Sequence, residues 1–284
     1  MSIETCPLSI QDIKSELAEI RETAAQNNSR ELLETALSCI DLTTLNPTDT
    51  ISSVRAFTEK VNQFPSKYSE LKNVAAICIY PNMAQTVKET LKAKGVKIAA
   101  VAGGFPSSMT FMEVKLQEVR MAVAAGADEI DIVMPLWAFM EGDNETCTSE
   151  ISTIKQAIGH AHLKVILETG VLSHDQIWQA SLLAMEAGAD FIKTSTGKLP
   201  QAASPEAALI MCLAIKQYYE ENDRKIGFKP AGGIVTPDEA MLYLTIVQEI
   251  LGNEWLTPEL FRIGASRLAN NLLGKITGTE VKHF

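Results

Sequence analysis

Cysteine and histidine are scarce in this chain of 284 residues, which has five of the former and four of the latter. The cysteines are Cys6, Cys39, Cys78, Cys147 and Cys212. Because their number is odd and no CxxC spacing occurs, we expect reduced thiols rather than disulfides. Only His160 and His162 stand close together among the histidines, and catalytic zinc needs a third protein ligand. The sequence therefore predicts no metal site.

Basic residues are fewer than acidic ones, 25 against 35, and the net charge is −10. This balance leaves no basic surface on which a nucleic acid could bind by releasing counterions. Long apolar runs are also lacking, since none approaches the roughly 18 residues of a spanning helix. The segment Met1–Leu17 carries charges where a signal peptide needs an apolar region. We therefore expect a cytoplasmic protein that binds neither nucleic acid nor membranes.

Nucleotide-binding motifs are absent too, because no GxGxxG follows the first predicted strand and no GxxxxGK[ST] occurs. What the chain does contain is 46% apolar and 21% charged residues, a composition that supports a sizeable folded core. Its length is ordinary for one α/β barrel. One large domain is therefore expected.

Short β-rich runs alternate with helical sequence along the chain. They are 37–42, 74–80, 98–103, 129–134, 164–169, 191–195, 226–231 and 261–264. Eight strands at the spacing of βα units predict a TIM (β/α)8 barrel, with a doubly wound open sheet as the alternative. The missing nucleotide motifs favour the barrel.

The ends of several predicted helices are marked by capping residues. Ser9 and Asp12 begin an amphipathic helix at the N-terminus, and Ser204 and Thr236 are each followed by proline and an acidic residue. Gly126 and Gly188 are placed as left-handed C-caps. We expect a helical extension at 1–31, on the barrel's outside or at a dimer contact. The catalytic barrel is predicted at 32–275 and a tail at 276–284.

Lys193 stands in a strand that should be apolar, within Phe-Ile-Lys-Thr-Ser. A lysine buried in a parallel strand must be neutral, paired or reactive. Strand alternation points Lys193, Lys229 and Asp131 into the same barrel mouth, where active sites of this fold lie. A nearby second ammonium lowers the pKa of the first, and a neutral lysine can form a Schiff base. The alternative is that both lysines have no catalytic role and either extend to solvent or pair with carboxylates.

Other polar residues late in strands are weaker candidates. Asp41 could bond a loop, and Glu168 or Thr169 follows the fifth strand. Cys78 is expected to be a small buried residue rather than a nucleophile, because no histidine partner is evident.

Small residues follow the last three predicted strands, where many barrels bind phosphate. The candidates are Thr196, Gly197, Lys198, Gly232, Gly233, Gly264, Ser266 and Arg267. Exposed backbone N–H groups would bind an anion, and Lys198 would add a positive charge. Either glycine loop alone is better explained as a tight turn, so the prediction depends on their joint occurrence.

Several of these segments together resemble the deoxyribose-phosphate aldolases, which are class I aldolases. The likeness runs from about Leu32 to Lys275 and is carried by five motifs. These are Ile-Asp-Leu-Thr-Thr-Leu at 40–45, Cys-Ile-Tyr-Pro at 78–81, Glu-Ile-Asp-Ile-Val at 129–133, Phe-Ile-Lys-Thr-Ser-Thr-Gly at 191–197 and Lys-Pro-Ala-Gly-Gly-Ile at 229–234.

The resemblance implies a TIM barrel that needs no cofactor and cleaves 2-deoxy-D-ribose 5-phosphate to acetaldehyde and D-glyceraldehyde 3-phosphate, in deoxyribonucleotide catabolism. It assigns the Schiff base to Lys193, the lowering of its pKa to Lys229, and proton transfer to Asp131. It places Asp41 and Cys78 in the substrate pocket and implies a homodimer. The alternatives are another Schiff-base aldolase, a sugar-phosphate isomerase, or a non-catalytic phosphosugar-binding barrel.

The sequence departs from the family pattern at three places. Val235 stands where many members have arginine, and Arg267 where some have a second serine. We hypothesise that Arg267 supplies the charge missing at Val235. The chain ends in Phe284, whereas some members end in a tyrosine that assists proton transfer. A role for a hydroxyl group in the tail is therefore not expected.

Overall fold

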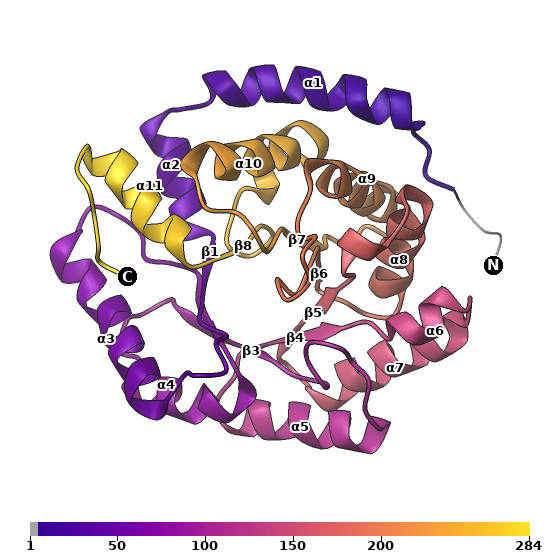
Figure 1. The fold of residues 1–284 in the computed structure, drawn as a ribbon, viewed down its shortest axis with the longest axis horizontal. Helices are drawn as coiled ribbons and strands as arrows, with labels where there is room; N and C mark the ends of the chain where they lie inside the picture. Colours follow the sequence, from indigo (N-terminus) through magenta and orange to yellow (C-terminus); the bar gives the residue numbers. More distant parts are fainter. Residues whose placement is uncertain (1–4) are drawn as a thin grey trace.

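Eight parallel strands form the central sheet of the computed structural model, which describes residues 5–284 (Figure 1). They are β1 (Ile40–Thr43), β2 (Ala76–Ile79), β3 (Lys97–Val101), β4 (Glu129–Val133), β5 (His162–Ile166), β6 (Phe191–Lys193), β7 (Gly227–Lys229) and β8 (Ile263–Ala265). The strands follow the chain order around the sheet, and β8 pairs with β1. Isolated bridges from Phe228 to Phe261 and from Ala231 to Gly264 join β7 to β8. The predicted TIM barrel is confirmed, and the open-sheet alternative is wrong.

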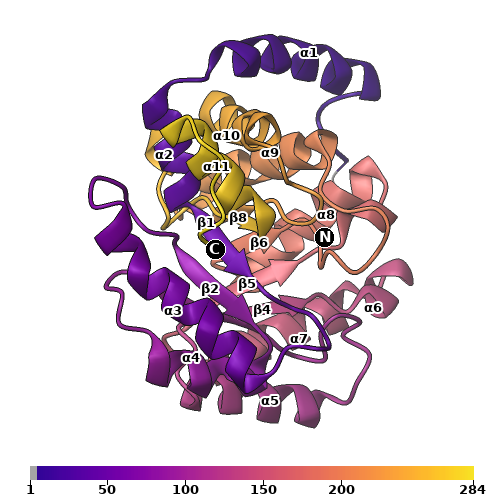
Figure 2. The same cartoon turned by 60° about the vertical axis from the view of Figure 1, so that its left-hand side comes forward.

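Helices surround the strands on all sides, as Figures 1 and 2 show. They are α1 (Ile10–Gln26), α2 (Arg30–Ser38), α3 (Ile51–Lys67), α4 (Ala84–Thr90), α5 (Met112–Ala124), α6 (Leu136–Met140), α7 (Asn144–Ala157), α8 (His174–Glu186), α9 (Pro205–Asn222), α10 (Pro237–Leu251) and α11 (Arg267–Thr277). Three short 3-10 helices are η1 (Pro81–Met83), η2 (Thr169–Val171) and η3 (Asn253–Trp255). Among residues 5–284, no helix is both long and apolar enough to cross a bilayer.

The predicted helix ends are confirmed by their hydrogen bonds. The Ser9 and Thr236 side chains each accept from the backbone N–H three residues later, within capping boxes. Ser204 caps α9 in the same way. Gly126 and Gly188 have φ values of 106° and 103°, a backbone region that glycine enters without steric cost.

The first predicted strand began too early. Leu37 and Ser38 belong to α2, and β1 starts only at Ile40. Ser29 caps α2 and fixes where this helix starts, and its buried residues then recur at helical spacing up to Leu37. The fifth strand was placed too late, because β5 starts at His162 and Thr169 lies in η2.

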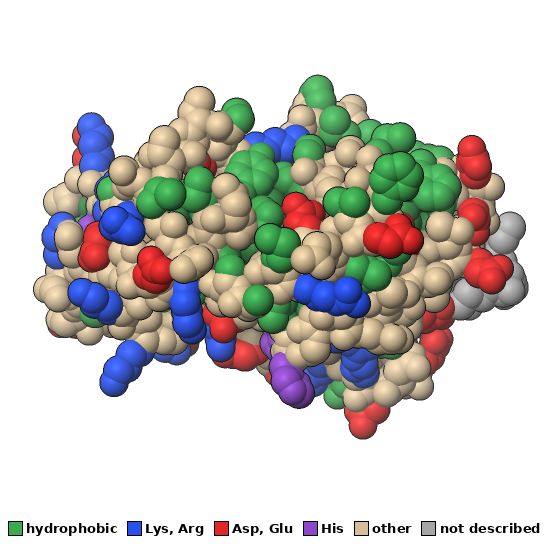
Figure 3. All heavy atoms as spheres, turned by 90° about the horizontal axis from the view of Figure 1, so that it is seen from below, with side chains coloured by type: hydrophobic (Ala, Val, Ile, Leu, Met, Phe, Trp, Pro, Cys, Tyr) green, Lys and Arg blue, Asp and Glu red, His purple; other side chains and the backbone are tan. Residues whose placement is uncertain are grey.

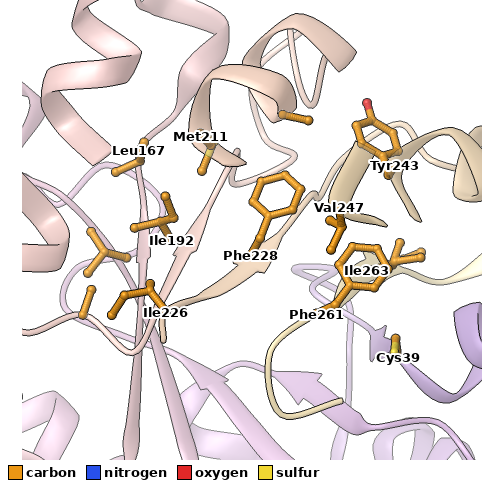
Figure 4. Close-up of a cluster of buried hydrophobic side chains, with 14 of the residues drawn as sticks. Cys39, Leu167, Ile192, Met211, Ile226, Phe228, Tyr243, Val247, Phe261 and Ile263 are labelled. Carbon is orange, nitrogen blue, oxygen red and sulfur yellow. The ribbon is translucent and has the colours of Figure 1, made fainter. Parts of the chain in front are cut away.

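The main core lies between the strands and the helices outside them. Figure 4 shows Ile192, Phe228 and Ile263 directed from β6, β7 and β8 toward Met211 of α9 and Val247 of α10. Strand neighbours point to opposite faces. The residues adjacent to these three, including Lys193 and Lys229, therefore face the barrel interior.

The N-terminal helix α1 crosses the outside of the ring above α9 and α10 (Figures 1 and 2). It buries Ile13, Leu17, Ile20 and Ala24. The barrel's exterior is one of the two positions expected for this helix. The first four residues of the proposed 1–31 extension lie outside the described residues.

Candidate active site

Seven charged side chains fill the inside of the barrel, and we call them the central charge cluster. They are Asp41, Glu129, Asp131, Lys164, Lys193, Lys229 and Arg262. Each side chain is buried, and none has more than 5% of its surface exposed. Six come from inward-facing strand positions, and Arg262 immediately precedes β8. Burial of so many charges is stable only when they pair with one another.

Lys193, Lys229 and Asp131 meet in this cluster. The two lysines are Cα partners across β6 and β7. Their Nζ atoms lie 2.9 Å and 2.8 Å from the same Asp131 oxygen, Oδ2. Lys229 also donates to Asp41. The three residues that the sequence predicted thus meet at one carboxylate oxygen.

The surroundings of the two lysines shift their pKa values in opposite directions. Burial lowers the pKa of Lys193, and the positive charge of Lys229 lowers it further, although Asp131 opposes both. Lys229 is equally buried, but Asp131 and Asp41 together raise its pKa above the ordinary value. The pKa of Asp131 falls well below its usual range, despite burial, because Lys164, Lys193 and Lys229 surround it. Of the two lysines, Lys193 therefore loses its proton more readily.

Sequence reasoning did not select Lys164, Glu129 or Arg262. The Lys164 ammonium donates to Glu129, lies 3.1 Å from Asp131 and is 3.7 Å from Asp41. Arg262 donates to Asp41 at 2.6 Å and to Glu129 at 2.7 Å. The sequence prediction was limited to polar residues near the carboxyl ends of the strands, whereas these three residues lie nearer the amino ends. Alternation would have found Glu129, which is two residues before Asp131 and so shares its face.

A cavity of about 440 Å³ opens above the cluster at the carboxyl ends of β1, β6, β7 and β8, and we call it the mouth cavity. Lys193 is the one member of the central charge cluster among its lining residues. The predicted phosphate-binding residues Thr196, Gly197, Lys198, Gly232, Gly233, Gly264, Ser266 and Arg267 also line it. Asp41 and Cys78 do not, because both are fully buried beneath it.

Glycine is required where the cavity's loops approach one another. Gly232 has a φ of 88°, and a Cβ there would lie 2.7 Å from Ala202 Cβ and 3.2 Å from Gly197 Cα. A Cβ at Gly264 would lie 2.8 Å from Ala231 Cβ. Any side chain would therefore force the loops apart. The close approach leaves backbone beside the mouth cavity, where an anion could bind it.

Besides Lys193, the basic side chains of Lys198 and Arg267 border the mouth cavity. Lys198 donates to the carbonyl oxygen of Leu45 and so joins the loop after β6 to the loop after β1. Arg267 is exposed at the first turn of α11, whose N-terminus adds a positive partial charge. Val235 also lines the cavity.

Glu168 supports the loop after β6 and does not line the mouth cavity. It is a buried residue with a φ of 57°, a strained conformation for a side chain of this size. Its carboxylate accepts hydrogen bonds from the backbone N–H of Thr196, at 3.1 Å, and from the Thr196 hydroxyl. That hydroxyl in turn accepts from the N–H of Lys198. The other candidate on this segment, Thr169, is buried in η2.

The arrangement supplies an amine nucleophile, an adjacent carboxylate for proton transfer, and a cavity suited to an anionic substrate. Among the described residues, no group of three or more histidine, cysteine, aspartate or glutamate side chains is arranged to hold a metal ion. The amine, the carboxylate and the cavity fit imine chemistry on a phosphorylated carbonyl compound.

Comparison with known proteins agrees with this chemistry. A family model described as DeoC/LacD family aldolase matches residues 35–253. The deoxyribose-phosphate aldolase of Mus musculus is 43% identical over 249 residues, covering 84% of this chain and 78% of the mouse protein. That of Homo sapiens is 40% identical over 271 residues, covering 91% and 85%.

Solved structures of the same kind share the fold. The deoxyribose-phosphate aldolase of Aeropyrum pernix, described as having a unique tetrameric structure, superposes with a TM-score of 0.69. It is 26% identical in sequence, and the match covers 94% of this chain and 98% of that protein.

Proposed function

Because this chain belongs to the DeoC/LacD family of aldolases, we propose that it is a lyase that reversibly cleaves 2-deoxy-D-ribose 5-phosphate to acetaldehyde and D-glyceraldehyde 3-phosphate. Lys193 carries this proposal, since its amine has a lowered pKa and lines the mouth cavity. We place the reaction in cytoplasmic deoxyribonucleotide catabolism. No cofactor is needed, because the protonated imine itself withdraws electrons.

In the condensation direction, the neutral Lys193 amine attacks the acetaldehyde carbonyl carbon. Asp131, whose Oδ2 lies 2.9 Å from Nζ, moves protons through a water as the carbinolamine loses water to form the iminium ion. Loss of a methyl proton then gives the enamine. The enamine carbon attacks the aldehyde of D-glyceraldehyde 3-phosphate, and hydrolysis of the new iminium releases the product.

The far end of the substrate binds at the opposite part of the mouth cavity. The glycine loops and the α11 N-terminus offer backbone N–H groups to the phosphate. Lys198 and Arg267 add positive charge. Asp41 acts from beneath the cavity by pairing with Lys229 and Arg262, and Cys78 fills space at the inner wall.

The direct test traps the imine. We expect acetaldehyde followed by borohydride to leave an ethyl group on Lys193, mapped by peptide mass spectrometry. The Lys225→Arg variant, altered at a partly exposed lysine outside the barrel, should be labelled at Lys193 to the same extent. A sugar-phosphate isomerase would release no acetaldehyde from the deoxyribose substrate, and a non-catalytic barrel would bind without turnover. An unlabelled Lys193 in the active protein would refute the mechanism.

Arg267 is proposed to replace the charge missing at Val235. We expect Arg267→Gln to raise KM for 2-deoxy-D-ribose 5-phosphate about tenfold, the effect of losing one charged contact. KM for unphosphorylated 2-deoxy-D-ribose should stay constant. Lys282→Gln removes the same charge from a side chain that is 84% exposed in the tail and serves as the control. An unchanged KM for the phosphorylated substrate would refute this role.

We also propose that the chain forms a homodimer through an apolar face on α5. The side chains of Val114 and Met121 on this helix are exposed, as are those of Met109 and Phe111 just before it, and Figure 3 shows hydrophobic side chains on this side of the molecule. A groove of about 640 Å³ beside Val114 and Met121 extends to Pro81. Projecting apolar side chains next to an apolar groove suit a two-fold contact, in which the side chains of each subunit insert into the groove of the other.

Substitution in this face tests the dimer. Met121→Glu is expected to convert a dimer to a monomer, because it would bury an unpaired charge in each half of the contact. Sedimentation velocity of the variant and the parent protein measures the change. Ile51→Glu places the same charge at another exposed apolar residue, on α3, and should leave the dimer intact. A parent protein that sediments as a monomer would contradict the proposal.

A further inference from the structure

The central charge cluster is not neutral when every member carries its usual charge. Its four cations are Lys164, Lys193, Lys229 and Arg262, and its three carboxylates are Asp41, Glu129 and Asp131. The difference, four minus three, is one positive charge inside the barrel. An uncompensated buried charge is costly, and a buried group loses its proton rather than keep it.

The contacts decide which cation is in excess. Lys164 lies within 3.7 Å of all three carboxylates, whereas Lys229 and Arg262 each contact two. Lys193 contacts only Asp131, and it shares that carboxylate with Lys164 and Lys229. Lys193 is therefore the cation whose charge is least compensated.

The other groups that face Lys193 do not change this balance. Asp131 of β4 and Lys229 of β7 are already counted. Cys78 of β2 also acts on Lys193, but burial raises the pKa of its thiol, so it contributes no charge at neutral pH. Lys164 of β5 binds the same carboxylate at its other oxygen, since its Nζ lies 3.1 Å from Asp131 Oδ1.

We propose that Lys164 is a positioning residue that keeps Lys193 unprotonated, because its contacts with all three carboxylates make Lys193 the excess cation. Lys164 lies below the mouth cavity, does not line it, and has no exposed surface. Of the three carboxylates that it contacts, Asp131 is the one that also binds Lys193. The inference deepens the proposed function, since it explains how the imine-forming lysine is prepared.

The variant Lys164→Met tests the proposal by removing one cation. Three cations then face three carboxylates, the excess disappears, and protonated Lys193 is stabilised. The pH midpoint for acetylation of Lys193 by acetic anhydride, followed by mass spectrometry, should rise by about one unit or more. The midpoint of kcat/KM should rise with it, and each unit lowers the neutral-amine fraction at pH 7 about tenfold.

The double variant Lys164→Met with Glu129→Gln restores the excess, since three cations face two carboxylates. Its midpoint should therefore return toward that of the parent protein. If Lys164→Met acted only by disturbing the packing of the core, the second core substitution would disturb it further and would not restore the midpoint. A folded Lys164→Met protein with the parent midpoint, or a double variant that stays shifted upward, would overturn the proposal. If Lys164→Met does not fold, Glu129→Gln alone is used as the test. Removing this carboxylate should lower the acetylation midpoint of Lys193. An unchanged midpoint would refute the proposal that the excess charge of the cluster keeps Lys193 unprotonated.

Acetylation does not depend on aldolase activity. If the parent protein forms no acetaldehyde imine, the proposed function fails while the acetylation midpoints still decide the role of Lys164. If the imine forms but the midpoints do not move, the function stands and the role of Lys164 is refuted.

Discussion

Lys193→Met is expected to lower kcat for cleavage by about 10⁴-fold or more, the scale of loss when an enzyme's nucleophile is removed. The substitution removes the amine that lines the mouth cavity and contacts Asp131. It also leaves three cations facing three carboxylates, so the fold should keep its stability. A coupled assay for D-glyceraldehyde 3-phosphate, together with thermal unfolding, measures both effects.

Lys225→Met is the matched control, because Lys225 pairs with Glu254 at the surface, away from the cavity. It should retain the kcat of the parent protein. Substantial cleavage by Lys193→Met would mean that another group forms the imine. A large drop in melting temperature would instead show that Lys193 is needed for the fold.

Asp131→Asn is expected to reduce kcat by about 10²- to 10⁴-fold, the usual contribution of a positioned acid or base. The amide keeps the shape of the carboxylate but cannot exchange protons with the imine intermediates. It also takes one negative charge from three lysines, which should destabilise the protein by about 3–5 kcal/mol. Exchange of acetaldehyde methyl protons in D2O, followed by NMR, isolates the proton-transfer step.

Asp223→Asn provides the comparison for this change. Asp223 is exposed at the end of α9 in the left-handed conformation, which asparagine also adopts readily. That variant should match the parent protein in exchange rate and in unfolding. Exchange at the parent rate in Asp131→Asn would exclude Asp131 from proton transfer.

The barrel and its helix ends could be predicted because both depend on local sequence. Caps such as Ser204 and Thr236 act within one turn, and strand alternation assigns Lys193 and Lys229 to the same interior. The start of β1 was misplaced because Leu37 suits a buried strand as well as a buried helix face. Only the extent of α2, which starts after Ser29, resolves this ambiguity.

The contacts of Arg262 in the central charge cluster could not be predicted in the same way. Arg262 lies outside any strand, and its partners Asp41 and Glu129 are 221 and 133 residues away in the sequence. Glu168 was noticed, but its direction depends on a left-handed backbone conformation that a strand pattern does not encode. Contacts of such long range are set by how the strands align around the barrel.

The charge count of the cluster also bears on the order of intermediates. With Lys193 neutral, three cations balance three carboxylates, and the interior is neutral before substrate binds. In the proposed reaction, formation of the iminium ion on Lys193 brings back the excess positive charge, and its conversion to the enamine removes that charge again. We therefore expect the protein interior to favour the nucleophilic enamine over its electrophilic precursor, so that carbon–carbon bond formation starts from the intermediate that the barrel stabilises most.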